Sequence, residues 1–168
     1  TTEPAEISRL RALAHPLRLR ILSLLAARDS TAAEVARELD VTPANASYHL
    51  RILMHAGFIA IAAEERIRGG LAKRYHYRPD PLPEDGSSAE FIAVMRAVTD
   101  ELLRRTDLHV PGQTWFTDAE LWLPPRVWDE VCRQLASASA IAHEAAEPPR
   151  TDGSLHTGLT LVAFRMCE

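Results

Sequence analysis

The sequence predicts an α+β protein whose N-terminal half is built from short helices and a β-hairpin. Apolar residues recur at helical spacing through the first 57 residues, and the pattern then changes to two strand-like runs separated by glycines. Residues 1–78 hold 12 lysines and arginines against 8 aspartates and glutamates, a balance of +4, whereas residues 79–168 hold 7 against 15, a balance of −8. The basic N-terminal half suits a polyanionic partner, and the acidic C-terminal half does not.

The composition is that of an ordinary globular chain. Of the 168 residues, 46% are hydrophobic and 25% are charged, which argues against disorder. No apolar run approaches the roughly 20 residues that cross a bilayer, and no signal peptide is visible, so we expect a cytoplasmic protein without a membrane partner. Cys132 and Cys167 are the two cysteines. Their lack of a spacing pattern favours a reducing compartment over a disulfide framework.

Two helices are expected before residue 30. The first ends before His15, and Pro16 can open the second because proline fits the first turn of a helix. Arg18, Arg20 and Arg28 are expected to lie off the apolar stripe of the second helix. The apolar residues that define the two stripes are Ile7, Leu10, Leu13 and Ala14, and then Leu17, Ile21, Leu24 and Leu25.

The next stretch predicts two short helices joined by a tight turn. Thr31 and Glu34 have the spacing of a capping box, in which each side chain satisfies a backbone N–H at the start of a helix. Thr42 followed by Pro43 supplies a second helix start, with a capping hydroxyl and a proline at the first helical position. Two capped helices separated by Asp40-Val41 have the form of a helix-turn-helix.

After this pair the periodicity becomes strand-like. Residues 58–63 and 71–77 each predict a strand, and Gly69-Gly70 lies in the turn between them, so the two runs predict a hairpin. Gly57 is well placed just past the end of the preceding helix, where glycine accommodates a left-handed backbone.

The order helix, helix, capped helix pair and hairpin is that of a winged helix. Residues 15–22 (His-Pro-Leu-Arg-Leu-Arg-Ile-Leu) and residues 47–53 (Ser-Tyr-His-Leu-Arg-Ile-Leu), followed by Ala56-Gly57-Phe58-Ile59, resemble the ArsR family of bacterial transcriptional regulators. The resemblance covers about residues 5–78. It implies a winged helix-turn-helix domain that binds double-stranded DNA and a chain that forms a homodimer.

The sequence predicts three parts. Residues 1–78 form the winged helix-turn-helix DNA-binding domain, and residues 79–88 form a linker because three prolines prevent a helix or strand. Residues 89–168 form a dimerisation helix and a small α/β C-terminal extension, a possible effector-binding region. The extension resembles the one found on some ArsR-like regulators.

The dimerisation helix is expected from about Ser88 to Arg105. Its apolar stripe is wide, and it can be covered either by the same helix of a second copy or by the chain's own core. The candidate dimerisation residues are Phe91, Val94, Met95, Val98 and Leu102.

The extension is expected to contain a strand over residues 115–123, a helix from Pro125 to about Ala145, and a final strand over residues 155–166. It also holds four large aromatic residues that could line a pocket for an apolar or aromatic ligand, or could form the core of a small domain. They are Trp115, Phe116, Trp122 and Trp128.

A recognition helix presents its first turns to the major groove, where each base pair offers a distinct pattern of donors and acceptors. Asn45 could address adenine, and His49 could contact DNA or could be a buried packing histidine. The candidate DNA-binding residues on the helix are Thr42, Pro43, Ala44, Asn45, Ser47, Tyr48, His49 and Arg51. Those on the hairpin are Arg66, Arg68, Lys73 and Arg74, which could contact phosphates or a narrow minor groove.

Metal sensing is the family property that these residues do not support. Many ArsR-like proteins bind metals through cysteines on the first helix of the helix-turn-helix, yet residues 33–39 contain none. The expected dimerisation helix carries no histidine paired with an acid at repeated helical spacing. We therefore expect no metal and no cofactor.

The sequence favours a dimeric repressor that binds an inverted-repeat operator and is released by a small molecule other than a metal. One alternative is a winged helix that binds proteins and not DNA. Another is an enzyme, but a nucleophile elbow, a glycine-rich phosphate loop and a His-Glu metal motif are all missing from the sequence.

Overall fold

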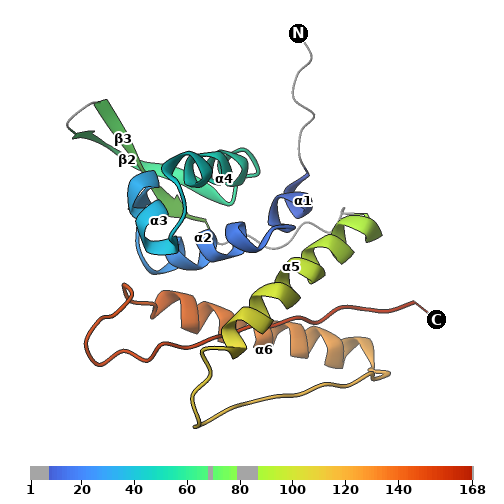
Figure 1. The fold of residues 1–168 in the computed structure, drawn as a ribbon. Coiled ribbons are helices and arrows are strands. Elements are labelled where there is room, and N and C mark those ends of the chain that lie inside the picture. The colour runs from blue at the N-terminus through green and yellow to red at the C-terminus, as the bar shows by residue number, and fades with distance from the viewer. Residues whose placement is uncertain (1–7, 68–69, 79–86, 168) are drawn as a thin grey trace.

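Figure 1 shows the computed structural model of the chain, which describes residues 8–67, 70–78 and 87–167. The α+β class is confirmed, because helices surround a three-stranded antiparallel sheet. The helices are α1 (Arg9–Leu13), α2 (Pro16–Ala27), α3 (Ala32–Leu39), α4 (Pro43–His55), α5 (Ser88–Thr106) and α6 (Pro125–Glu144). The strands are β1 (Ser30–Thr31), β2 (Ile59–Ile67) and β3 (Gly70–Tyr77).

The helix starts that the sequence predicts are confirmed by their capping bonds. The side chains of Thr31 and Glu34 cap each other's backbone N–H groups at the start of α3. The predicted linker falls largely on residues 79–86, which lie outside the described residues. Its last two residues start α5 instead, since Ser87 is the N-cap, forms a second capping box with Glu90, and is followed by the first helical residue, Ser88.

The sheet has the strand order β1-β3-β2. The predicted hairpin is confirmed as β2 and β3, with Ile61 opposite Tyr75 and Ala63 opposite Arg74, so Ala62 forms a bulge. The sequence did not predict β1, in which Ser30 pairs with Tyr75. Two residues are too few to produce a periodic pattern, and β1 is defined only by its pairing with β3.

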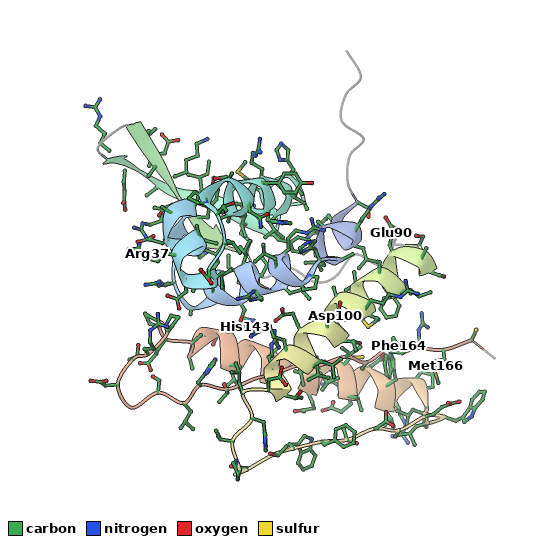
Figure 2. All side chains as sticks on the ribbon, in the orientation of Figure 1. Arg37, Glu90, Asp100, His143, Phe164 and Met166 are labelled. Atoms are coloured by element: carbon green, nitrogen blue, oxygen red, sulfur yellow. The ribbon has the colours of Figure 1, made fainter. Side chains whose placement is uncertain are left out.

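One hydrophobic core holds the N-terminal half together. Helices α1 to α4 and the first residues of β2 contribute to it, and α5 packs across α1 and α2 to close it. Ser8 Oγ donates a hydrogen bond to Glu90 Oε1, which joins α1 to α5, and Figure 2 labels Glu90 at this end of the helix. The largest fully buried side chains include Ile21, Leu25, Leu50 and Leu53.

The two strands predicted in the C-terminal extension are wrong for this chain. Residues 110–123 and 155–167 run as long extended segments beside α6 (Figure 1), but among the described residues no backbone–backbone hydrogen bond joins them to each other or to any strand. The local pattern favoured an extended backbone, and a strand also needs a neighbour to pair with. The predicted helix between them is confirmed as α6, so the extension is helical rather than α/β.

No helix in the described part of the chain is both long enough and apolar enough to span a membrane.

Candidate nucleic-acid interface

The start of α4 is fixed by its cap. The Thr42 hydroxyl accepts a hydrogen bond of 3.2 Å from the backbone N–H of Asn45, and Pro43 occupies the first helical position. At the other end Gly57 adopts φ +79°, and the Phe58 N–H donates to the Leu53 carbonyl at 3.0 Å. The predicted glycine termination of the helix is confirmed.

The turn between α3 and α4 sets the angle of the second helix. Asp40 has a left-handed backbone with φ 53°, and the Val41 N–H donates to the Ala36 carbonyl at 2.9 Å. Aspartate is one of the few residues other than glycine that tolerates this conformation. The short turn therefore holds α4 in one orientation on α3, as a helix-turn-helix requires.

One face of α4 is buried and the other is open. Ala46, His49, Leu50 and Leu53 lie in the core, so the residues between them point outward. Tyr48 is 52% exposed and Ser47 is half-buried. The other exposed candidates on this face are Thr42, Pro43, Ala44, Asn45 and Arg51.

His49 is the candidate on α4 that the structure removes from the interface. It is only 5% exposed, and its ring lies 4.5 Å from the ring of His15 and 5.1 Å from that of Tyr48. Burial, followed by the nearby His15 and Arg18, lowers the pKa of His49 from 6.5 to about 4. A neutral, buried His49 lies behind Tyr48, as the packing alternative predicts.

Arg18 is part of the same buried cluster, and the exposed position predicted for it is wrong. It was expected off the stripe of α2, yet it is buried and its Nη2 donates to the Arg11 carbonyl at 3.2 Å. The signal was present in the sequence, because Arg18 stands three residues before Ile21 and seven before Leu25, on the same helical face.

The hairpin of β2 and β3 projects beyond the helices, as Figure 1 shows. Arg66 and Lys73 are both exposed on it, with Arg66 opposite Leu71 and Lys73 opposite Glu64 in the strand register. Arg68 lies outside the described residues. The hairpin therefore presents at least two cations beside α4.

Arg74 is committed to contacts within the fold. Its Nη1 lies 2.8 Å from the Asp29 carbonyl and 3.1 Å from Glu34 Oε2, and its Nε lies 2.8 Å from Glu65 Oε1. Glu34 also caps α3, and its pKa is lowered first by the Thr31 N–H and then by Arg74. We expected Arg74 to contact DNA. Its guanidinium instead joins the hairpin to the start of α3.

The prediction of the dimerisation residues on α5 also needs a correction. Val94 is only 2% exposed and packs into the core of its own chain, so it is not available to a second copy. Phe91, Met95 and Val98 are partly buried against the same core, and Leu102 is exposed. The alternative in which the chain's own core covers α5 is correct for Val94, while the outer side of the helix stays open.

The four aromatic residues of the extension do not surround a cavity in this chain. Trp115, Phe116 and Trp122 are 88%, 83% and 84% exposed, and Trp128 is half-buried on α6. A pocket requires side chains that bury one another around a space, and three of these four lie in solvent. They do not form the core of a small domain either.

Among the described residues, no group of three or more histidine, cysteine, aspartate or glutamate side chains is placed to hold a metal ion. Cys132 is half-buried and Cys167 is exposed, and both are free thiols.

Comparison with known families agrees with this geometry. Residues 13–62 match the family described as "Helix-turn-helix domain". The match begins at the end of α1 and ends within β2, so it spans α2, α3 and α4. None of the curated proteins matches the chain. The chain therefore contains a helix-turn-helix domain, a module that binds DNA in regulators.

Proposed function

We propose that this chain is a dimeric transcriptional repressor of the ArsR type, with α4 as its DNA-recognition helix. The observation that carries the proposal is the division of α4 into a buried face and an open face. The core holds Leu50 and Leu53, while Asn45, Tyr48 and Arg51 stand on the exposed side of a helix with capped ends. Such a helix can enter a major groove without rearranging.

Each exposed residue of α4 has a distinct part in this proposal. Asn45, in the first turn, bonds adenine through its amide, and Tyr48 and Ser47 bond a base edge or a phosphate. Arg51, one turn further on, contacts the phosphate backbone. Thr42, Pro43 and Ala44 lie at the tip of the helix and pack against the edges of the groove.

The hairpin provides a second contact. Arg66 and Lys73 bind phosphates beside a minor groove, and Arg68 adds to them. The α4 helices of two copies, related by a two-fold axis, read the half-sites of an inverted repeat about one helical turn apart.

The proposal is tested by fluorescence anisotropy with the DNA upstream of the chain's own gene. Asn45→Ala is expected to weaken binding about 10-fold or more and to relax the preference at one base pair. Ser23→Ala is the control, since Ser23 is an exposed polar residue on α2. Equal affinity of Asn45→Ala and wild type for the operator would contradict the role of α4.

The proposed contact between the hairpin and DNA phosphates is tested by the salt dependence of DNA binding. Arg66→Ala combined with Lys73→Ala is expected to weaken binding to all sequences alike and to reduce the slope of log affinity against log salt by about 0.9 for each phosphate that is no longer neutralised. Arg11→Ala, which removes an exposed arginine on α1, should leave the affinity and the salt slope unchanged. A wild type that binds no DNA, operator or otherwise, would favour the protein-binding alternative.

A further inference from the structure

The C-terminal segment (residues 107–167) lacks a core of its own. Helix α6 has 20 residues and buries none of them, and none of the buried residues of the chain lies beyond Glu101 in the described part of the sequence. The helix is nevertheless amphipathic, with Val127, Trp128, Val131 and Leu135 at helical spacing. A face of this kind is stable in water only when something covers it.

The two extended stretches of the segment are equally open. Trp115, Phe116 and Trp122 precede α6, and Leu155 and Phe164 follow it, with exposed fractions between 50% and 88%. Side chains of the stretch between α5 and α6 stand away from the rest of the molecule in Figure 2. Their backbone N–H and C=O groups make no ladder with a described strand and are free to pair with another chain.

A few contacts hold the segment against the rest of the chain. The rings of Phe91 and Phe164 meet edge to face at 5.4 Å, and Figure 2 shows Phe164 beside α5. Arg105 Nη1 donates to the Leu159 carbonyl at 3.3 Å and to Thr160 Oγ1 at 3.2 Å. These contacts fix where the segment runs and leave its apolar side chains in solvent.

The open surface continues onto the dimerisation helix. A groove of about 470 Å³ is lined by Phe91, Ile92, Met95, Arg96, Thr99, Asp100 and Phe164. It joins the outer side of α5 to the end of the C-terminal segment. The exposed apolar surface therefore comprises the C-terminal segment and this groove on the outer side of α5.

We propose that a second copy of this chain covers this surface, so that the C-terminal segments of two chains complete one another in an intertwined dimer. This inference deepens the homodimer of the proposed function and names the surface that forms it. Residues 107–167 supply most of the interface, and the groove on α5 supplies the rest.

The exposed area is sufficient for a stable dimer. A buried aromatic side chain removes about 150–250 Å² from water, and three of them are more than four-fifths exposed in each chain. Counted over both chains, these side chains alone bury on the order of 1,000 Å², the size at which specific interfaces begin. The apolar residues of α6 and of the last stretch add to this area.

The charge of the segment argues against anionic partners. Residues 107–168 hold 4 arginines against 9 aspartates and glutamates, a balance of −5. DNA and anionic membrane surfaces are repelled by such a surface. A second copy is favoured because the helix-turn-helix domain needs a two-fold partner, and because a two-fold contact places the same apolar patch on both sides.

The dimer is tested by sedimentation equilibrium and acrylamide quenching of the full chain over a range of concentrations. Wild type is expected to be a dimer whose tryptophans are protected at high concentration and become accessible on dilution, since Trp115 and Trp122 are exposed in the single chain. Trp115→Glu with Trp122→Glu should raise the dimer Kd at least about 100-fold. Circular dichroism should show unchanged helix content, because neither side chain is buried.

Leu71→Glu is the matched control, an exposed apolar residue of β3 changed to the same charge, and its dimer Kd should equal that of wild type. A wild-type chain that remains a monomer, with tryptophans fully accessible to acrylamide, would overturn the inference. It would do so even if a different partner covered the segment. So would a dimer that the double tryptophan variant leaves intact.

Salt separates this inference from the proposed function. Both interface surfaces are acidic, so added salt should strengthen the dimer by screening their repulsion, whereas it should weaken DNA binding. A dimer that binds no DNA contradicts the proposed function alone. A monomer that binds DNA contradicts this inference and the dimeric part of the proposed function, and leaves α4 as the recognition helix.

Discussion

The helix-turn-helix region (residues 8–78) and the C-terminal segment (residues 107–167) are close in length, yet the first buries a core and the second buries nothing. Both contain helices with clear apolar faces. In the first region four helices and a hairpin turn those faces toward one another, whereas the extended chain that runs along α6 buries none of its residues (Figure 1). Amphipathic local structure is thus necessary for a domain and not sufficient for one.

The two regions are expected to differ most in the free energy of unfolding that is lost when a leucine is changed to alanine. Leu50→Ala on α4 should lower the free energy of unfolding by about 2–5 kcal/mol, because Leu50 is completely buried. Leu121→Ala in the C-terminal segment should change it by less than about 0.5 kcal/mol, since Leu121 is 65% exposed. Urea denaturation at a concentration where sedimentation shows monomer measures both. Similar losses would mean that the C-terminal segment has a core of its own.

The pH dependence of stability should come from the buried histidines of the first region. Folding lowers the pKa of His49 from 6.5 to about 4, and the pKa of His15 is lowered in the same direction by burial. The unfolded chain therefore binds protons that the folded chain excludes, and stability present above pH 6.5 is lost as the pH falls toward 4. The loss from His49 is about 2–3 kcal/mol.

This prediction is checked by urea titrations at pH 7.5 and pH 4.5. In His49→Gln the difference between the two pH values should shrink, because the glutamine does not titrate. A variant that loses as much stability as wild type on acidification would show that His49 is not responsible.

Two glycines with nearly the same backbone allow a matched comparison. Gly57 has φ +79° and Gly153 has φ +83°, and an added Cβ would meet no atom within 4 Å at either position. Gly57→Ala should cost about 1 kcal/mol, because the bonds that end α4 hold the left-handed conformation. Gly153→Ala should leave the unfolding free energy of the helix-turn-helix region unchanged. Thermal melts of the two variants measure how much the stability of the helix-turn-helix region depends on each of these turns.

The smallest effect is expected where the two regions touch through charge. Arg150 Nη2 lies 2.7 Å from Glu38 Oε2 on α3, but the arginine side chain is mostly exposed. Exposed ion pairs contribute about 0–1 kcal/mol, and salt weakens them. Arg150→Ala should therefore lower stability by less than about 0.5 kcal/mol in urea denaturation. A larger loss would show that the C-terminal segment supports the helix-turn-helix region.

Much of the first region was predictable because its signals are local. The caps at Thr31 and Thr42 and the glycine after α4 each depend on residues within four or five positions of one another, and the hairpin joins two strands that are adjacent in the sequence. The exposed face of α4 followed from helical periodicity in the same way. The candidate residues Asn45, Ser47, Tyr48 and Arg51 were chosen on that ground.

The predictions that differ from the structure concern residues whose contacts are distant in the sequence. Arg74 was assigned to DNA because it lies on the hairpin, but it pairs with Glu34, 40 residues away. Val94 lies on an apolar stripe that could face either a partner or the core, and only the packing of α5 on α1 and α2 decides which. A charge or an apolar residue in the sequence does not specify the group that it will meet.

By itself, the sequence determined the helix-turn-helix, its caps and the hairpin, since these depend on backbone geometry and on neighbours a few residues apart. Only the tertiary structure decided which charges belong to the fold, which side of α5 is open and whether the C-terminal strands exist. Burial and strand pairing are properties of two surfaces in contact. The sequence of one surface predicts that it needs a partner, and the arrangement in space shows whether the same chain provides it.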